Sequence, residues 1–422
     1  MNTYQLFKTT LVLALSHAVA AQELQPLGAY SPVVERCGPN NNVVCVNKYA
    51  SVLPYHFFRN TSTIGNVLDL RNTSVPSDPS FELLSNASFV VFNRERGLAS
   101  LGANPTYDFI FEVSAAVHEA PVWIASQNKL YMSQLAPPAG YLPQLVVDLN
   151  QDPPTLSEYL SDPPVYAPNG GTSYASGTQI LWAASGGNNS IGNPPTEQRV
   201  SLRILDPTTN KTTTILNNYF GSYFNCMDDV AIHPVTGDIF FTDPMYSWFN
   251  QLTDTPPQLP TASYRFNPKT GATYLIDVSL EQPNGIAFNS DGTTLYISDT
   301  GAVSANKGLG LQVGTYNATR PATIYAFDVT HNGTRVVNKR AFHLAQSWVP
   351  DGLKVSREGL VLAGAGDGVD VLDEEGALVM RVQTNYTVQN FAWVGEGLRE
   401  LWMMGNGGVS RVRWEVQGQV QT

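Results

Sequence analysis

Six acidic or amide residues each open a copy of one short sequence pattern. In the clearest copy, Asn284 starts an apolar run that ends at Phe288, Asp291-Gly292 follows, and a second apolar run occupies residues 294–299. The other copies start at Glu119, Asn169, Asp228, Asp351 and Asn390. Carboxylate and amide oxygens are the ligands that hard cations prefer. If the fold brings the six side chains together, they form a site for such a cation.

The elements that carry these residues are predicted to be β-hairpins. Two apolar runs joined by a tight turn are typical of a hairpin, and Asp291-Gly292 supplies the positive φ that the turn needs. Most copies are separated by roughly 40 to 65 residues, the spacing of propeller blades. The innermost strand of each blade begins at one mouth of the central channel, so we expect the six residues to ring one axis.

The predicted fold is all-β: a six-bladed β-propeller over residues 89–416 with a metal site in the central channel. Four blades are expected at residues 116–165, 166–224, 225–281 and 282–347, and two compact blades follow. Residues 22–88 are rich in Pro, Asn, Ser and Thr, which predicts an extended N-terminal arm that contributes to ring closure. The closing strand is expected at residues 89–92 or 109–113, and the sequence leaves both open.

The composition narrows the classes of partner. The chain of 422 residues has a net charge of −11, which is unfavourable for binding nucleic acid or an anionic membrane. We therefore predict a small-molecule partner, no nucleic acid and no membrane. The sequence leaves the oligomeric state open.

Residues 1–21 are typical of a secretory signal peptide. Lys8 precedes an apolar run at residues 11–15, and residues 18–20 have the small side chains of a cleavage site. The apolar run is shorter than the roughly 20 residues that a membrane span needs. We therefore expect a secreted, extracellular protein. Its Asn-X-Ser/Thr sequons predict glycosylation at Asn60, Asn72, Asn86, Asn188, Asn210, Asn317, Asn332 and Asn385.

The three cysteines divide into a pair and a single residue. Cys37 and Cys45 are close in a Gly/Pro/Asn-rich stretch, and in an oxidising compartment we expect them to form a local disulfide. Cys226 is left over, and no His stands with it in a Cys/His motif. A buried, unreactive thiol is the favoured interpretation.

The order and spacing of these motifs resemble the SMP-30/gluconolactonase/LRE family of six-bladed propellers, and within it the secreted fungal lactonohydrolases. The resemblance covers residues 116–414 and rests on four segments. These are Glu119-Ala120-Pro121-Val122-Trp123, Phe240-Phe241-Thr242-Asp243-Pro244, Pro283-Asn284-Gly285 with its hairpin, and Pro350-Asp351-Gly352. Members of this family include calcium-dependent lactonases.

The resemblance implies a set of metal ligands. The family's ion is held by a Glu, an Asn and an Asp from different blades, with a fourth axial residue nearby, and the matching positions here are Glu119, Asn284, Asp351 and Asp228. The sequence departs from the family at the fourth position, because it has Asp228-Asp229-Val230 where Asn-Asp-Val is usual. The additional carboxylate can bind the ion or act as a base. Ca²⁺ is the expected cofactor, with Zn²⁺ or Mn²⁺ as alternatives.

The same resemblance implies hydrolysis of a small, sugar-derived lactone. That reaction needs a Lewis acid at the carbonyl oxygen, an activated water and stabilisation of the oxyanion. Asp351 or Asp228 could take the proton of the water, and the sequence leaves the choice open. Two alternatives compete with this reading: a strictosidine-synthase-like propeller, and a non-enzymatic binding propeller whose Ca²⁺ is structural.

Four further residues are candidates to bind the substrate, and for Asn169 and Asn390 the sequence leaves metal binding open as well. Asn169 and Asn390 stand at the axial positions, and Tyr246 and Trp348 lie close to such positions in the sequence. Each has an ordinary structural alternative, because Asn is common at turns and aromatic side chains commonly pack in cores. No Gly-X-Ser-X-Gly elbow is present, which weighs against a serine hydrolase.

Overall fold

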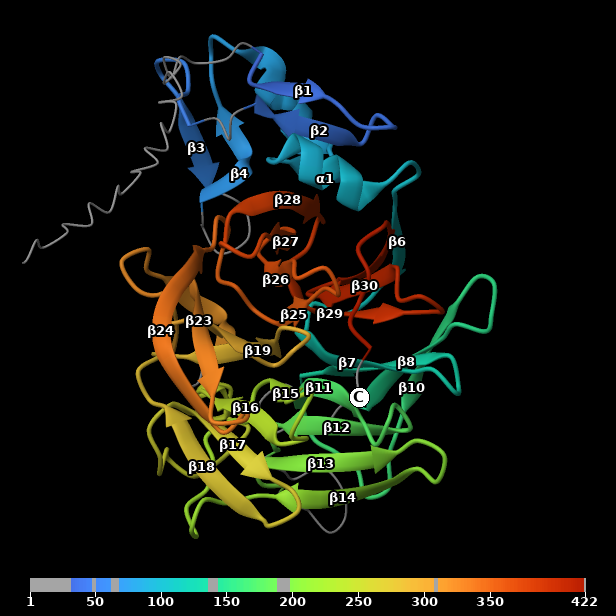
Figure 1. Ribbon diagram of the computed structural model, residues 1–422, viewed down its shortest axis with the longest axis vertical. Helices are drawn as coiled ribbons and strands as arrows, with labels where there is room; N and C mark the ends of the chain where they lie inside the picture. The colour runs from blue at the N-terminus through green and yellow to red at the C-terminus, as the bar shows by residue number, and fades with distance from the viewer. Residues whose placement is uncertain are drawn as a thin grey trace, which may run out of the picture.

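The fold is a β-propeller, seen in a computed structural model that describes residues 32–47, 51–61, 68–135, 143–187, 198–306 and 310–420 (Figure 1). The predicted signal peptide and the sequon at Asn188 lie outside these residues. Among the residues described, no helix combines the length and the apolar character that crossing a bilayer requires.

Five sheets are four-stranded antiparallel blades. Four of them follow the chain directly: β7 (His118–Ile124), β8 (Lys129–Gln134), β9 (Gln144–Asp148) and β10 (Thr155–Tyr159); β11 (Pro168–Tyr174), β12 (Gln179–Ala184), β13 (Ser201–Asp206) and β14 (Lys211–Leu216); β15 (Val230–Ile232), β16 (Ile239–Asp243), β17 (Ala262–Asn267) and β18 (Ala272–Asp277); β19 (Pro283–Phe288), β20 (Thr294–Asp299), β23 (Thr323–Thr330) and β24 (Arg335–Leu344). A short hairpin, β21 (Val303–Asn306) and β22 (Gly310–Tyr316), is inserted in the fourth, and α2 (Tyr246–Phe249) in the third.

The fifth blade closes the ring. It consists of β29 (Val388–Val394), β30 (Glu400–Gly405) and β31 (Gly408–Arg413), and its outer strand is β6 (Thr106–Glu112) from the N-terminal side of the propeller. Of the two closing strands that the sequence left open, the one at residues 109–113 is therefore correct. Residues 89–91 pair instead with another sheet.

The prediction of six separate four-stranded blades is wrong, because the sixth group of strands belongs to a larger sheet. Residues expected as the next-to-last blade form β25 (Leu353–Val355), β26 (Val361–Ala365), β27 (Gly368–Leu372) and β28 (Leu378–Gln383), but these strands belong to a seven-stranded sheet. β5 (Phe89–Val91) pairs with β28, and β2 (Val43–Val46) and β1 (Val34–Arg36) extend the sheet further. Its inner strand β25 packs between β19 and β29, so this sheet also borders the central channel.

The N-terminal stretch is folded, and the prediction of an extended arm is wrong for its described residues. Besides β1 and β2 it contains β3 (Phe58–Thr61), β4 (Leu68–Ser74), the 3₁₀ helix η2 (Pro79–Asn86) and, after β5, helix α1 (Arg94–Leu101). Figure 1 shows β1–β4 and α1 gathered at one end of the molecule, beyond β28. The sequence analysis missed these strands and helices because elements this short carry little periodic signal.

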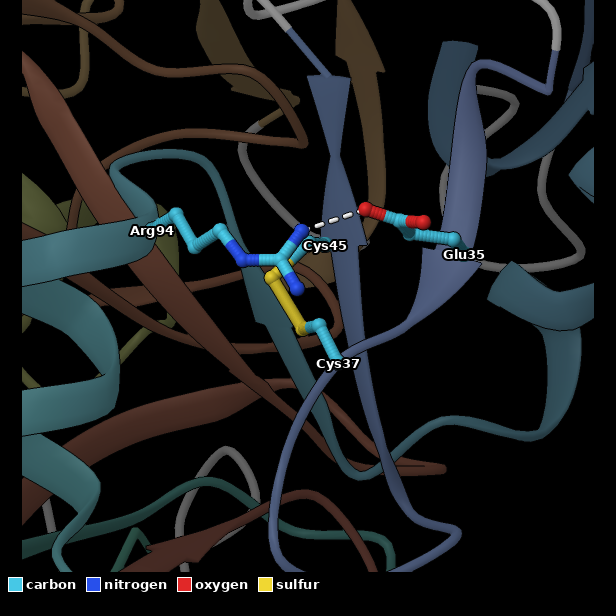
Figure 2. The surroundings of a disulfide bond; sticks show 4 residues. All are labelled: Glu35, Cys37, Cys45 and Arg94. Atoms are coloured by element: carbon cyan, nitrogen blue, oxygen red, sulfur yellow. Dashed lines mark hydrogen bonds and ion pairs between the residues drawn. A yellow bond between two sulfur atoms is a disulfide. The ribbon is translucent and has the colours of Figure 1, made fainter.

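A disulfide between Cys37 and Cys45 joins the β1–β2 hairpin, as predicted. Beside it, Arg94 of α1 forms an ion pair with Glu35 of β1 (Figure 2). Cys226 is fully buried, and its Sγ lies 3.2 Å from Oγ of Ser185.

A buried charge network fixes the N-terminal stretch to the propeller. Arg381 of β28 is fully buried and donates to both carboxylate oxygens of Asp370, at 2.6 and 2.9 Å. Its Nη1 also lies 3.5 Å from Oδ1 of Asp69 in β4. Burial and the neighbouring Asp69 raise the pKa of Asp367 to about 7. The side chains of Asp69 and Asp367 are hydrogen-bonded to each other at this junction.

This junction predicts a pH-dependent stability. The folded protein keeps a proton on Asp367 up to about pH 7, whereas the unfolded chain releases it near pH 4, so the free energy of unfolding should fall as the pH rises between these values. Asp367→Asn mimics the protonated form and should reduce this fall. Urea unfolding at pH 5 and pH 8 measures the effect, with Asp277→Asn on the outer strand β18 as the control. An unchanged pH dependence in Asp367→Asn would contradict the prediction.

Candidate functional site

The six pattern residues lie where the innermost strands begin, at one end of the central channel. Glu119, Asn169, Asn284 and Asn390 belong to β7, β11, β19 and β29, and Asp228 and Asp351 come directly before β15 and β25. Each of these strands packs against the inner strands of its neighbours. Residues separated by more than 250 positions in the chain are therefore brought to a common axis.

Local irregularities in the strands point these side chains toward the axis. The pairing register shifts between Glu119 and Val122, between Pro168 and Gly170, between Pro283 and Ile286, and between Val388 and Asn390. Such bulges turn a strand locally and re-aim a side chain. Four site residues therefore occupy positions that a regular alternating strand would not give them.

The glycines that follow two of the site asparagines allow adjacent blades to approach closely. A Cβ on Gly170 would lie 2.4 Å from the carbonyl oxygen of Asp228, and one on Gly285 would lie 2.3 Å from that of Asp351. These are backbone atoms and cannot move aside without shifting a strand. Gly is therefore required at both positions for packing between blades.

A cavity of about 530 Å³ opens over this end of the channel. Of the predicted site residues, Glu119, Asn169, Asp228, Asn284 and Asp351 line it, together with Tyr246 and Trp348. Asn390 does not line it: this side chain is buried beneath, bonded to Glu119 and to the backbone N–H of Phe391. Asn390 is thus placed as a support for Glu119, and its role in substrate binding stays a prediction.

Three buried carboxylates meet at the floor of the cavity. The pKa of Glu119 is raised well above its usual value, mainly by burial. The negative charges of Asp351, Asp228 and Asp229 raise this pKa further. Burial, with the charges of Asp351, Asp229 and Asp243, also raises the pKa of Asp228 well above its usual value. The pKa of Asp351 is raised to about 7, again first by burial. Without a counter-charge, this concentration of carboxylates is electrostatically unfavourable.

The donor set fits a hard cation. Three buried oxygens that face this cavity have no hydrogen-bond partner: Oδ1 of Asn169, Oδ2 of Asp228 and Oδ1 of Asp351. An unpaired buried polar atom is costly, and a bound cation would satisfy all three. Within the described parts of the chain, no group of three or more His, Cys, Asp or Glu side chains is drawn close enough to hold a metal ion by itself. The amides of Asn169 and Asn284 would therefore be needed to complete the ligand set.

Tyr246 and Asn284 form a polar chain beside the carboxylates at the floor of the cavity. Nδ2 of Asn284 donates to the hydroxyl of Tyr246 at 3.3 Å, and this hydroxyl also forms a short hydrogen bond with Thr300. The side chain of Asn284 also bonds to Asp351. Tyr246 is buried, so it orients the Asn284 amide as well as lining the cavity.

The sequence analysis missed a repeated hydroxyl that ties three of the blades to the backbone at or next to the site residue of the following blade. Ser133 of β8 donates to the carbonyl oxygen of Pro168, Thr242 of β16 to that of Asn284 at 2.6 Å, and Ser298 of β20 to that of Asp351 at 3.0 Å. All three hydroxyl residues are fully buried. Their signal in the sequence is a Ser or Thr near the end of the second strand of a repeat.

Two aspartates that follow such hydroxyls hold the loops before the site residues. Asp243 accepts hydrogen bonds from the N–H groups of Asn225, Cys226 and Met227, at 2.8 to 3.1 Å, and so fixes the approach to Asp228. Asp299 accepts from Glu281 and Gln282, both at 2.9 Å, before Asn284. The pairs Thr242-Asp243 and Ser298-Asp299 are visible in the sequence, and their common spacing could have revealed this role.

The chain belongs to the SMP-30/gluconolactonase/LRE family. The sequence model of the SMP-30/Gluconolactonase/LRE-like region matches residues 169–306 and 313–405, which is more than half of the chain. Lactonohydrolase oryL of Aspergillus oryzae is 44% identical over 89% of this chain and 86% of its own length. Lactonohydrolase oryH of the same organism is 36% identical over 92% of this chain and 94% of its own length.

Solved structures at lower identity share the fold. A gluconolactonase from Xanthomonas campestris superimposes with a TM-score of 0.61 at 23% identity, covering 77% of this chain and 94% of the other. The calcium-binding protein regucalcin from Agrobacterium tumefaciens superimposes with a TM-score of 0.53 at 15% identity, covering 75% and 96%. The predicted family and the all-β propeller class are thereby confirmed.

The hydroxyl links can be tested by an isosteric change. Thr242→Val removes the donor to the Asn284 carbonyl and the acceptor for the Asp229 N–H, so we expect a loss of about 1 to 3 kcal/mol in the free energy of unfolding. Thr214→Val on the exposed face of β14 is the matched control and should cost much less. Urea denaturation measures both. Equal losses for the two variants would contradict a special role for Thr242.

Proposed function

We propose that this protein hydrolyses lactones and that it uses Ca²⁺ to do so. The observation that carries the proposal is the cluster of buried carboxylate and amide oxygens at the floor of an open cavity, three of them without a partner. The family membership and the lactonohydrolase names of the relatives support the reaction class.

The residues that would hold the ion are Glu119, Asp228, Asn284 and Asp351, with Asn169 beside them. When bound, the ion supplies a Lewis acid for the lactone carbonyl and a positive charge for the oxyanion. Hard oxygen ligands and a majority of carboxylates favour Ca²⁺, and Zn²⁺ or Mn²⁺ are the alternatives to be tested.

The remaining chemistry belongs to the side chains of this chain. A carboxylate oxygen of Asp351 or Asp228 that does not bind the ion takes a proton from the water that attacks the carbonyl carbon. The bond between the carbonyl carbon and the ring oxygen then breaks, and the ring oxygen receives a proton to give the hydroxy acid. Tyr246 and Asn284 fix the polar floor against which the lactone ring is oriented.

Other nucleophiles are poorly placed for this reaction. Burial and the charge of Asp228 raise the pKa of Cys226, which keeps its thiol protonated. His118 is fully buried, and its Nδ1 lies 3.0 Å from the carbonyl oxygen of Gly405, away from the cavity. Neither Cys226 nor His118 is therefore placed to form a covalent intermediate with the substrate.

We further propose that the protein acts outside the cell as a glycoprotein. The disulfide supports an oxidising compartment. Among the predicted sequons, Asn86, Asn317, Asn332 and Asn385 are exposed, whereas Asn72 and Asn210 are partly buried and the side chain of Asn60 lies outside the described residues. Asn210 is bonded through its side chain to Tyr159 and Leu160, which disfavours a glycan there.

Metal dependence is the first test of the proposed reaction. A pH-indicator assay on a panel of lactones should show turnover that disappears after chelation and returns with added Ca²⁺. Thermal stability should also rise with added Ca²⁺, since an ion that binds only the folded state stabilises it. Activity that persists in the chelated protein would contradict the proposal. A folded, Ca²⁺-loaded protein without turnover would favour a structural ion in a binding propeller.

Substitution of the two candidate bases is the second test. Asp351→Asn and Asp228→Asn each keep the side-chain shape and remove a carboxylate. The variant at the residue that acts as the base should have a kcat lower by on the order of 10²- to 10⁴-fold. Ca²⁺ affinity, measured by calorimetry, distinguishes a lost ligand from a lost base. Asp291→Asn, in an exposed turn, is the matched control. Wild-type kcat in both site variants would exclude both residues as the base.

A further inference from the structure

The walls of the site cavity are chemically different from its floor. Above the carboxylates, one set of lining residues is apolar and comes from several separate segments of the chain: Val117, Leu135, Leu252, Val303, Trp348 and Val349. Polar residues complete the lining: Ser185, Asn250, Thr300, Asn385, Thr387, Gln389 and Asn406. A ring with a hydroxyl on most carbons needs a hydrogen-bond partner for each, because a polar group buried without one is costly. The apolar side chains offer little of that kind.

The apolar walls are preformed by packing within the protein. Leu252 is buried against Ala167 and Leu135 on one side of the cavity. On another side, Val303 and Val349 are buried in a cluster with Trp348, whose ring stacks on Tyr316 at 5.8 Å between centroids. Side chains held in this way keep their apolar surface turned to the cavity at little entropic cost on binding.

Several polar groups of the lining already have partners in the protein. Thr300 is bonded to Tyr246, Gln389 donates to Asn406, and Asn406 donates to the carbonyl oxygen of Ala115. To bind a polyhydroxylated ring, these bonds would have to be exchanged for bonds to the substrate, which gives little net free energy.

The charges of the lining are all negative. Glu119, Asp228 and Asp351 are its charged side chains, and no Lys, Arg or His of the described chain joins them there. One divalent cation would leave one negative charge in excess over these three carboxylates. A substrate that carries its own carboxylate or phosphate would therefore find no cationic side chain to receive it.

We propose that the substrate is a neutral lactone that carries an alkyl or aryl substituent, and that Leu252, Val303 and Trp348 form the pocket for this substituent. This inference rests on the proposed lactone hydrolysis and departs from the sugar-derived substrate that the sequence analysis favoured. The cavity of about 530 Å³ lies in the range of sites that bury most of a small organic ligand.

The test compares four lactones on the Ca²⁺-loaded protein: γ-butyrolactone, γ-octalactone, γ-phenyl-γ-butyrolactone and glucono-δ-lactone. Each buried methylene is worth several-fold in kcat/KM, so γ-octalactone should exceed γ-butyrolactone by on the order of 10- to 100-fold. Glucono-δ-lactone should be the poorest substrate relative to its rate of uncatalysed hydrolysis. A kcat/KM for glucono-δ-lactone equal to or above that of the substituted lactones overturns this inference and leaves lactone hydrolysis in place. Absence of turnover on all four overturns both.

Variants of the wall provide an independent readout. Val303→Thr is nearly isosteric and places a hydroxyl in the apolar wall, and Trp348→Ala removes the ring that forms one side. Both should lower the ratio of kcat/KM for γ-octalactone to that for γ-butyrolactone, by about 3-fold or more. Val235→Thr is the control, because Val235 is 76% exposed and lies outside the cavity lining. An unchanged ratio in both wall variants, with the proteins folded and active, overturns the assignment of these residues.

Discussion

Mutual repulsion among buried carboxylates is the constraint on which the rest of this structure depends. Glu119, Asp228 and Asp351 come from three different sheets. Burial raises the pKa of each, and the charges of neighbouring carboxylates, Asp229 among them in every case, add to the rise. No single hairpin could hold these groups together against repulsion in a poorly hydrated place. The closed ring can, because each inner strand is fixed by the strands on both sides of it. A cation of two positive charges would turn the same arrangement into a favourable one.

Hydrogen bonds and close packing between blades hold the site oxygens in defined positions. Buried hydroxyls on second strands bond to carbonyl oxygens at the next site position, and Gly170 and Gly285 allow neighbouring strands to approach to a distance that any Cβ would prevent. Loop aspartates such as Asp243 fix the backbone just before a site residue. These groups contact neither substrate nor ion, yet they determine where the site oxygens lie. A site supported in this way is preorganised, so little free energy is spent on ordering its groups when a ligand binds or reacts.

The cavity combines two chemical environments that are produced by different parts of the fold. Its polar floor comes from the starts of the inner strands, whereas its apolar walls come from loops and inserted elements such as the segment around Leu252 and the hairpin that begins at Val303. The inner strands form the repeating framework, so the floor is tied to the family. Loops tolerate change more readily than the strands they join, so the walls are free to set the choice of substrate. The N-terminal stretch is held to another part of the ring by Arg381 and Asp69, apart from the residues that line the cavity.

The hairpin pattern, the all-β propeller class and the five axial side chains that line the cavity could be predicted from the sequence, because each copy of the pattern repeats the same local chemistry. The disulfide could also be predicted, because Cys37 and Cys45 are close in the chain. The sequence could not determine how the repeats join: the segment at residues 353–383 was expected to be an independent blade and instead shares a sheet with β5, β2 and β1. Strand partners far apart in the chain leave no local signal, and neither does the burial of Asn390 beneath Glu119. The apolar character of the walls was likewise decided only by tertiary structure, since Leu135, Leu252, Val303 and Trp348 are distant in sequence and meet only around the closed ring.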